Sequence, residues 1–209
     1  HPNEILVLLY YYLLKYKGWK GPAVRNIGTT HILDKIAQAF GEKCYEVPVG
    51  FKHISSMMEK TNALIGGESS GGLTVRGHIP GKDGIFAASL LIELISVTGK
   101  SLSGLLDEIH QQFGNSFTHE SDYKFSAQDK PKLIKKLFEE KKIPEYDYKI
   151  ATVSYMDGLK IYFDNGGWVL VRFSGTEPLI RIFSEMDTQK EADDVAETMR
   201  DFLGLSPNQ

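Results

Sequence analysis

The feature of this sequence that most constrains its fold is an uninterrupted apolar run near the start, from Ile5 to Leu14. Pro2 has the fixed φ that suits a first helical turn, and Lys15, Lys17 and Gly18 close the far end of the run. The run is about half of the roughly 20 residues that a bilayer crossing needs, and it lacks the basic residues that precede the apolar core of a signal peptide. It therefore predicts a helix that is buried on most of its sides, and no membrane partner.

Short apolar segments then alternate with helical spacings. Strands are expected at 23–27, 43–49 and 63–66, and helices at 31–40, around 54–58, at 84–97 and at 102–113. Short buried strands separated by helices are typical of a parallel sheet that is covered on both faces. The first part of the chain is therefore expected to be a three-layer α/β domain with a mostly parallel, mixed sheet.

The pattern changes after Gly114, where a polar stretch begins that has Pro131 near an expected helix start. Strands are expected at 149–155, 159–163, 167–173 and 179–184, and a last helix at 188–203. The turns at 156–158 and 164–167 contain glycine, which accepts a positive φ at low cost. Thr188 and Glu191 have the spacing of a capping box. We expect a small α+β domain with an antiparallel sheet here, and we place the two domains at 1–117 and 118–209.

Charge and cysteine content narrow the classes of function. With 24 Lys and Arg against 27 Asp and Glu, the formal net charge is -3, which argues against a general nucleic-acid binder. Cys44 is the only cysteine in the sequence, so no intrachain disulfide can form. The sequence therefore favours a cytoplasmic protein without a nucleic-acid partner.

A glycine-rich segment, Gly-Gly-Glu-Ser-Ser-Gly-Gly at 66–72, follows the third expected strand. It has nothing apolar to pack, and a loop after a parallel strand lies where α/β domains bind ligands. The carboxylate of Glu68 and the neighbouring hydroxyls suit hydrogen bonds to vicinal hydroxyls of a sugar. The alternative is a flexible loop with a solvated acid, and composition alone gives the two interpretations equal weight.

A second segment, Arg-Phe-Ser-Gly-Thr-Glu-Pro at 172–178, joins two expected strands. Arg172 offers a planar fork of donors that matches two phosphate oxygens. Ser174 and Thr176 offer hydroxyl donors, and Gly175 lets backbone N–H groups approach an anion. The alternative is an ordinary hairpin with one surface arginine, and the residues favour the anion site only slightly.

Familiar nucleotide and metal motifs are absent from the sequence. There is no Gly-x-Gly pair, no P-loop, no His-x-x-x-His, no cysteine pair and no Asp-x-Asp. The sequence therefore predicts no metal site in this chain.

Together, the two segments resemble loops of the α-D-phosphohexomutases. The sugar-recognition loop of that family, Gly-Glu-x-Ser-Gly, stands here at 67–71. Its phosphate loop, Arg-x-Ser-(Gly/Asn)-Thr-x-Pro, stands intact at 172–178. The stretches 49–52 and 77–84 also look like the phosphoglucomutase/phosphomannomutase branch. The resemblance covers essentially the whole chain, in order.

The resemblance implies an enzyme that interconverts the 1-phosphate and 6-phosphate of glucose or mannose through a bisphosphorylated intermediate. In that family a phosphoserine in domain 1 and a Mg²⁺ ion on an acidic loop of domain 2 serve phosphoryl transfer, and glucose 1,6-bisphosphate is the activator. The present chain contains neither loop. It is therefore expected to be the C-terminal half, domains 3 and 4. Its partners would be a hexose phosphate and the N-terminal domains of the same polypeptide, with no cofactor bound to it and no activity alone.

The same resemblance assigns substrate-binding roles and no catalytic residue. The expected contacts are Glu68 and Ser70 with sugar hydroxyls, and Arg172, Ser174, Gly175 and Thr176 with the phosphate that is not being transferred.

Two further basic residues are weaker candidates for substrate binding. Arg25 falls near a basic position that contacts the ligand in the family, with an exposed strand-end charge as its alternative. Lys52 follows Gly50 in an expected turn. His78 is a candidate for fixing its loop, and Arg181 could face the phosphate loop or pair with Glu177 or Glu185.

Three other functions remain open from sequence. The first is a phosphoglucosamine mutase fragment, against which Ser69 and the run 78–84 count. The second is a stand-alone sugar-phosphate binding module without a catalytic half. The third is a structural protein whose loops are incidental.

Overall fold

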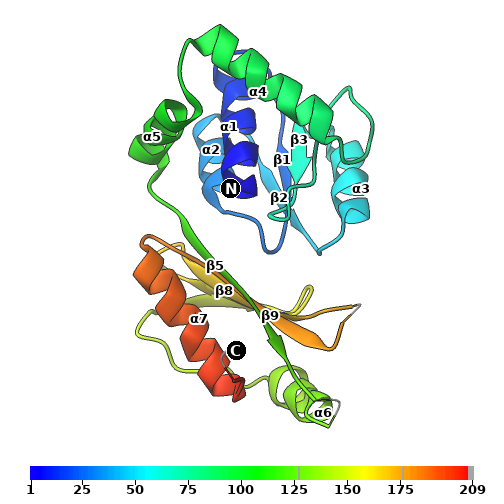
Figure 1. Cartoon of the computed structure of the whole chain (residues 1–209), viewed down its shortest axis with the longest axis vertical. Helices are drawn as coiled ribbons and strands as arrows, with labels where there is room; N and C mark the ends of the chain where they lie inside the picture. The colour runs from blue at the N-terminus through cyan, green and yellow to red at the C-terminus, as the bar shows by residue number, and fades with distance from the viewer. Residues whose placement is uncertain (127, 176, 207–209) are drawn as a thin grey trace. The chain divides into compact units, whose positions relative to one another are not determined.

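The computed structural model describes residues 1–126, 128–175 and 177–206. The chain divides into two compact units, 1–115 and 116–209, where the sequence suggested 1–117 and 118–209 (Figure 1). The first unit has a sheet covered by helices and the second has an antiparallel sheet with its own helices. The expected fold class is confirmed.

Helix α1 (Pro2–Lys15) is the helix that the apolar run predicts. Residues 6–14 are each at most 5% exposed, so the helix is buried on nearly every side. Its three tyrosines bury their rings while each hydroxyl donates a hydrogen bond, as buried polar groups require. The acceptors are Gly21 O for Tyr10 at 3.1 Å, Glu108 Oε1 for Tyr11 at 2.9 Å and Glu93 Oε1 for Tyr12 at 2.6 Å.

The sheet of the first unit has the order β2-β1-β3-β4. Its strands are β1 (Ala23–Asn26), β2 (Cys44–Val47), β3 (Ile65–Gly67) and β4 (Leu73–Val75). β1 is parallel to both β2 and β3, whereas β4 is antiparallel to β3. The sequence did not predict β4, because its three residues lie just beyond the glycine-rich segment.

Helices cover both faces of this sheet. They are α2 (Ile32–Ala39), α3 (Phe51–Thr61), α4 (Gly84–Thr98) and α5 (Leu102–Phe113). α3 packs on one face, in a small core formed by Val24, Val47, Ile54, Met58 and Ala63. The other face packs against α1 and α2, and α4 and α5 join the same core. The result is the expected three-layer arrangement.

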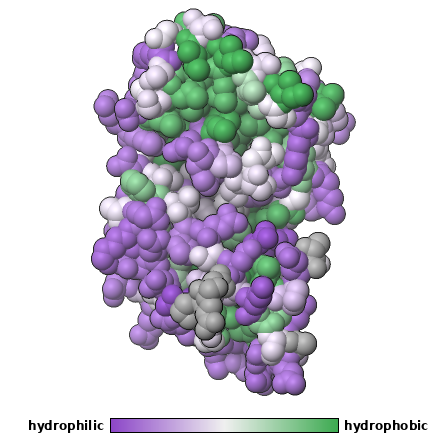
Figure 2. Space-filling view, in the orientation of Figure 1, coloured by the Kyte–Doolittle hydropathy of each residue, from purple (hydrophilic) through white to green (hydrophobic). Residues whose placement is uncertain are grey.

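One side of α4 is apolar and exposed. Ile85, Ile92, Ile95 and Val97 are 84%, 66%, 42% and 60% exposed, and Figure 2 shows hydrophobic side chains gathered over this helix. Among the described residues, no single helix has the length and apolar character to cross a membrane. By length and composition alone, α4 and α5 pass that test as a pair, bent by 80°.

The second unit is a five-stranded sheet of order β5-β9-β8-β7-β6 with antiparallel neighbours throughout. Its strands are β5 (Phe117–Lys124), β6 (Ile150–Ser154), β7 (Leu159–Phe163), β8 (Trp168–Phe173) and β9 (Leu179–Met186). The helices are α6 (Lys130–Ile134), which continues as a π-helical turn over Lys135–Glu139, and α7 (Gln189–Leu203). Thr188 Oγ1 accepts from Glu191 N at 3.2 Å, as the expected cap requires.

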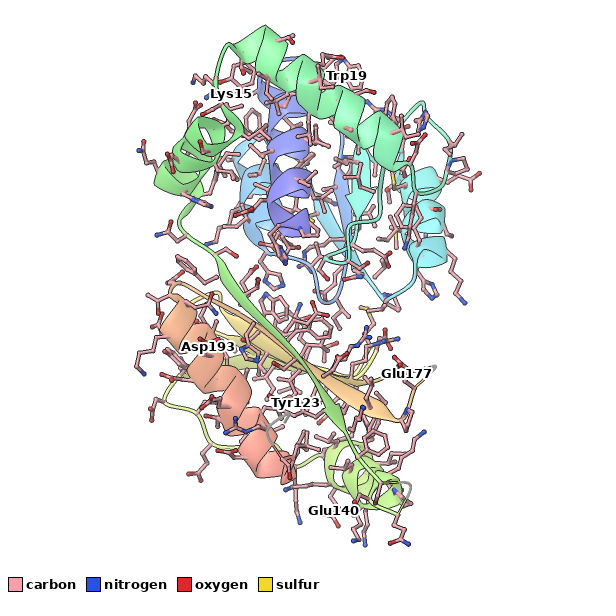
Figure 3. The ribbon with its side chains drawn as sticks, viewed as in Figure 1. Lys15, Trp19, Tyr123, Glu140, Glu177 and Asp193 are labelled. Atoms are coloured by element: carbon pink, nitrogen blue, oxygen red, sulfur yellow. The ribbon has the colours of Figure 1, made fainter. Side chains whose placement is uncertain are left out.

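β5 was not expected from sequence. It pairs with β9 over all eight of its residues. His119 and Ser121 of β5 share one face of the sheet. His119 Nδ1 lies 2.8 Å from Oδ1 of Asp193 on α7, and Figure 3 labels Asp193. The polar strand is thus held by backbone pairing and by contacts with α7.

Candidate functional site

Glu68 lies at the carboxyl ends of the three parallel strands. It directly follows β3, while Asn26 ends β1 and Gly50 comes after β2. Glu68 Oε1 accepts from Gly50 N at 3.2 Å and from Asn26 Nδ2 at 3.4 Å. The side chain is 4% exposed, so this carboxylate is fixed in a buried polar environment. The sequence alternative of a solvated acid is wrong.

The glycine-rich loop is fastened to the end of β1. Ser69 N donates to Thr29 Oγ1 at 3.0 Å, and Thr29 Oγ1 donates to Asn26 Oδ1 at 2.8 Å. Within the loop, Glu68 N donates to the Gly72 carbonyl at 2.9 Å. Ser70 is exposed at the tip of this loop. The loop therefore presents a hydroxyl to solvent beside a buried carboxylate.

Lys82 is a member of this group that sequence reasoning missed. Its Nζ lies 2.9 Å from Glu68 Oε2, and the side chain is 53% exposed. A Cβ on Gly72 would stand 2.6 Å from Lys82 Cε, so the glycine makes room for the lysine stem. A signal for Lys82 is present in the sequence, because the residue lies within the run 77–84.

The loop that carries Lys82 is held by His78 and Asp83. His78 Nε2 lies 2.8 Å from Asp83 Oδ2, and the imidazole stacks on Phe86 with 3.9 Å between ring centroids. Asp83 Oδ1 caps α4 by accepting from the backbone N–H groups of Ile85 and Phe86, both at 3.0 Å. The Phe86 N–H and the His78 imidazole both hold the pKa of Asp83 below its ordinary value. His78 thus fixes its loop, as the sequence suggested.

Arg25 and Lys52 have different surroundings. Arg25 is 3% exposed, and its guanidinium contacts Asp34 Oδ2 at 2.6 Å and Glu46 Oε2 at 2.5 Å. The alternative of an exposed strand-end charge is therefore wrong. That Arg25 binds the ligand stays a prediction, and its guanidinium already contacts two carboxylates. Lys52 is exposed in the first turn of α3, two residues after Gly50.

The second expected site lies between β8 and β9, where Figure 3 labels Glu177. Ser174 N donates to the Leu179 carbonyl at 2.9 Å, and Ser174 Oγ accepts from Glu177 N at 3.3 Å. Gly175 is exposed, and among the described residues no atom other than those of its chain neighbours lies within 4 Å of the place where a Cβ would stand. Thr176 lies outside the described residues. The described residues of this segment are joined by hydrogen bonds between Ser174, Glu177 and Leu179, and the flank at Gly175 is open.

Arg172 ends this turn on the β8 side. Its Nε lies 2.9 Å from Asp157 Oδ2, and Asp157 belongs to the turn between β6 and β7. The cross-strand partner of Arg172 on β9 is Arg181. Arg181 pairs with Asp122 of β5 at 2.9 Å, and this is neither of the two glutamates that the sequence suggested.

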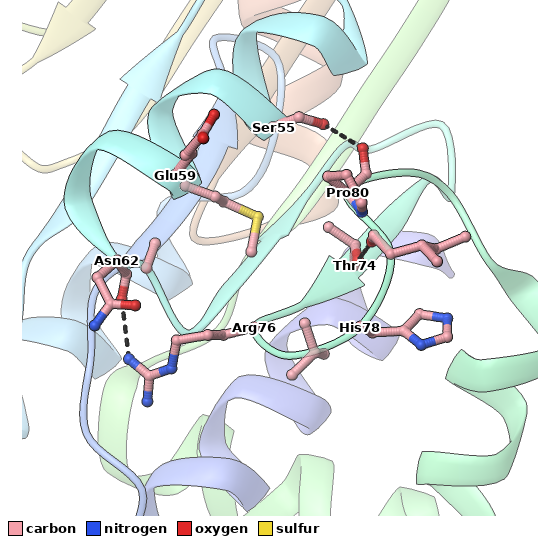
Figure 4. A pocket seen from close by; sticks show the side chains of 11 residues that line it. Ser55, Glu59, Asn62, Thr74, Arg76, His78 and Pro80 are labelled. Carbon is pink, nitrogen blue, oxygen red and sulfur yellow. Dashed lines mark hydrogen bonds between the residues drawn. The ribbon is translucent and has the colours of Figure 1, made fainter.

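A pocket of about 290 Å³ lies elsewhere in the first unit, between α3 and the segment after β4 (Figure 4). Arg76 on its wall donates to the Asn62 carbonyl at 2.9 Å, and Ser55 donates to the Pro80 carbonyl at 3.0 Å. None of the expected substrate-binding residues that the structure describes lines it. The pocket and the Glu68 loop are therefore different features.

Comparison with known families assigns both units. Residues 1–113 match the model of phosphoglucomutase/phosphomannomutase, alpha/beta/alpha domain III. The chain belongs to this family. Residues 125–202 match the C-terminal domain of phosphoglucomutase/phosphomannomutase, so the two units are domains III and IV. The resemblance stated from the sequence is confirmed.

Relatives agree with this assignment. A phosphoglucomutase/phosphomannomutase of Thermococcus kodakarensis is 38% identical over 82% of this chain and 35% of its own length. A probable phosphoglucosamine mutase of Methanosphaera stadtmanae is 30% identical over 90% of this chain and 40% of its own length. A crystal structure of parafusin, a phosphoglucomutase from Paramecium, superposes with a TM-score of 0.71 at 25% identity over 97% of this chain and 42% of that one. The chain thus spans about two fifths of the length of such family members.

Proposed function

We propose that this chain is the substrate-binding half of a phosphohexomutase that interconverts hexose 1-phosphate and hexose 6-phosphate through a bisphosphorylated intermediate. The observation that carries the proposal is the buried carboxylate of Glu68 at the carboxyl ends of three parallel strands, beside the exposed Ser70. A fixed carboxylate accepts hydrogen bonds from vicinal sugar hydroxyls, and a loop hydroxyl adds a third contact. Lys82 supplies positive charge beside the same carboxylate, and Lys52 lies two residues after Gly50, whose N–H donates to that carboxylate.

In the second unit, the phosphate that is not being transferred binds at the turn 172–178. Arg172 gives charge-assisted donors, and Ser174 and Thr176 give hydroxyls. The open flank at Gly175 supports this role, because an anion can approach the backbone there. Because the sugar must present either end for transfer, this turn accepts the 1-phosphate and the 6-phosphate in alternation.

The phosphoryl-transfer machinery belongs, in this proposal, to the N-terminal domains of the same polypeptide. Among the described residues there is no group of three His, Cys, Asp or Glu side chains that could hold a metal ion. The residues present therefore do not fit the Mg²⁺ site of the family, and no step is assigned to that ion here. We place the enzyme in the cytoplasm, with glucose 1,6-bisphosphate as the activator of the complete protein.

The proposal is tested by titrating glucose 6-phosphate into the purified chain in a calorimeter. Arg172→Ala should weaken binding about tenfold or more, since a charge-assisted hydrogen bond contributes roughly 1.5–3 kcal/mol. Arg200→Ala is the matched control, because Arg200 lies on α7 and pairs with Asp201 and Glu197. Equal affinities of wild type and Arg172→Ala would reject the phosphate site.

Phosphoglucosamine mutase is the second candidate function. The Methanosphaera relative favours it, while the closer identity to the Thermococcus protein favours glucose or mannose. The same calorimeter decides between them when glucose 6-phosphate, mannose 6-phosphate and glucosamine 6-phosphate are compared. Tighter binding of the amino sugar would support the second candidate.

A further inference from the structure

The arginine of the proposed phosphate turn, Arg172, contacts a carboxylate from another turn of the sheet. Asp157 Oδ2 lies 2.9 Å from Arg172 Nε, and the two side chains are 25% and 21% exposed. Neither residue is a sequence neighbour of the other, and Asp157 is not part of the segment 172–178. The contact joins the β6–β7 turn to the end of β8.

The turn that carries Asp157 is pressed against β8. Gly158 has φ 101° and a Cβ there would stand 2.4 Å from the Val171 carbonyl and 3.2 Å from Arg172 Cβ. Both the left-handed φ and this close approach require glycine. The register pairs Leu159 with Val171, so the position of Asp157 relative to Arg172 is set by the backbone of two paired strands.

From this geometry we propose that Asp157 is a positioning residue for phosphate recognition, acting through Arg172. The guanidinium is planar and rigid, so a bond at Nε fixes the plane of the whole group. The terminal N–H groups then meet a phosphate in one preset orientation, and less freedom is lost on binding. This inference rests on the proposed phosphate site at 172–178.

The neighbouring arginine provides a matched comparison on the same sheet. Arg181 is the cross-strand partner of Arg172, and its Nε lies 2.9 Å from Asp122 Oδ1. Like charges directly opposite each other destabilise a sheet, so both carboxylates also offset that repulsion. Asp122 shares this structural task with Asp157, but it lies on β5 and contacts Arg181, whereas Asp157 contacts Arg172.

The sign of the effect on affinity separates positioning from simple charge. A carboxylate near an anion site repels the anion, so removal of Asp157 would strengthen phosphate binding if charge were its only influence. If Asp157 positions Arg172, Asp157→Ala weakens binding of glucose 6-phosphate and of inorganic phosphate about three- to tenfold, which corresponds to one lost hydrogen bond. Asp157→Asn keeps an acceptor for Nε and loses the charge, so its affinity equals or exceeds that of wild type.

The titrations use the full 209-residue chain, with Asp122→Ala as the control that removes a carboxylate from the other arginine. We expect Asp122→Ala to bind phosphate as wild type does, and Asp157→Ala to cause no further weakening in an Arg172→Ala background. Unchanged or tighter binding by Asp157→Ala overturns the inference while the effect of Arg172→Ala still supports the phosphate site. If Arg172→Ala has no effect, the proposed function itself fails. Should Asp157→Ala not fold, weaker binding by Asp157→Asn overturns the inference.

Discussion

Glu68 and Arg25 are both buried and both paired with groups of opposite charge, but the exposure of their partners differs. Arg25 contacts two carboxylates and is 3% exposed, so its charge is balanced inside the protein. Glu68 is balanced by Lys82, which is 53% exposed. The head group of Lys82 lies near water, whereas the carboxylate of Glu68 is buried, so loss of this contact would leave the carboxylate without its cation. The sugar hydroxyl proposed above would therefore meet a buried carboxylate whose cationic partner is exposed.

Removal of that partner should destabilise the first unit. Lys82→Met leaves Glu68 without its cation, and we expect the free energy of unfolding to fall by about 0.5–1.5 kcal/mol, a value reduced by the exposure of the lysine. Lys43→Met is the control, because Lys43 is exposed just before β2. Urea titrations of both variants measure the difference.

A double-mutant cycle tells whether the loss comes from the Glu68–Lys82 pair. In a Glu68→Gln background the carboxylate is gone, so Lys82→Met should cost much less. Equal costs in both backgrounds would show that Lys82 acts on stability by another route.

At the scale of helices and strands, the sequence predicted elements with a strong apolar period and missed those without one. α5 was expected at 102–113 and is Leu102–Phe113 in the structure, while α4 ends one residue beyond its expected end. β5 has few apolar residues and exists because its backbone pairs with β9, which no local pattern reveals. β4 is too short to show any period. Among the strands that the sequence predicted, β7, β8 and β9 contain buried Val, Ile or Leu residues, whereas β6 has no buried residue.

The contacts of the candidate sites were less predictable than the loops that carry them. Glycine content and residue type identified 66–72 and 172–178. Lys82 and Asp157 lie in other loops, and only the folding of the chain brings them into contact with Glu68 and Arg172. Pairing of this kind depends on tertiary structure, so spacing in the sequence does not reveal it.

The junction of α1 and α5 predicts a dependence of stability on pH. Glu108 of α5 binds Lys100 at 2.5 Å and also binds Lys15 of α1, and these bonds lower the pKa of Glu108 from 4.5 to about 2. A carboxylate whose pKa is lower in the folded state stabilises the fold above its unfolded pKa. That contribution should therefore be lost as the pH falls from about 4.5 to about 2.

The measurement compares the midpoint of thermal unfolding at about pH 6, above that window, with the midpoint at about pH 3, within it. Glu108→Gln should lower the midpoint at the higher pH and reduce the difference between the two pH values. Asp107→Asn is the control, since Asp107 is the exposed neighbour on α5. An identical pH dependence in Glu108→Gln and wild type would contradict the assignment.

At the scale of the whole molecule, each unit carries one of the two proposed binding loops, and the described residues hold no cluster suited to a metal. Binding a sugar and a phosphate does not by itself lower a chemical barrier. We therefore expect no conversion of glucose 1-phosphate to glucose 6-phosphate by this chain alone, even with Mg²⁺ and glucose 1,6-bisphosphate. A coupled assay checks this, and turnover that disappears in Glu68→Ala would show that the chain carries its own catalytic machinery.

The exposed side of α4 has a practical consequence for anyone who prepares this chain. Its isoleucine and valine side chains are exposed to water along much of this 15-residue helix. The helix has one charged side chain, Glu93, and that carboxylate is already paired with Lys17. Such a surface adsorbs to hydrophobic resins, and it makes dyes that respond to apolar surroundings fluoresce although the protein is folded. A molecular chaperone that binds exposed apolar surface would therefore be expected to bind the folded chain as it binds an unfolded one.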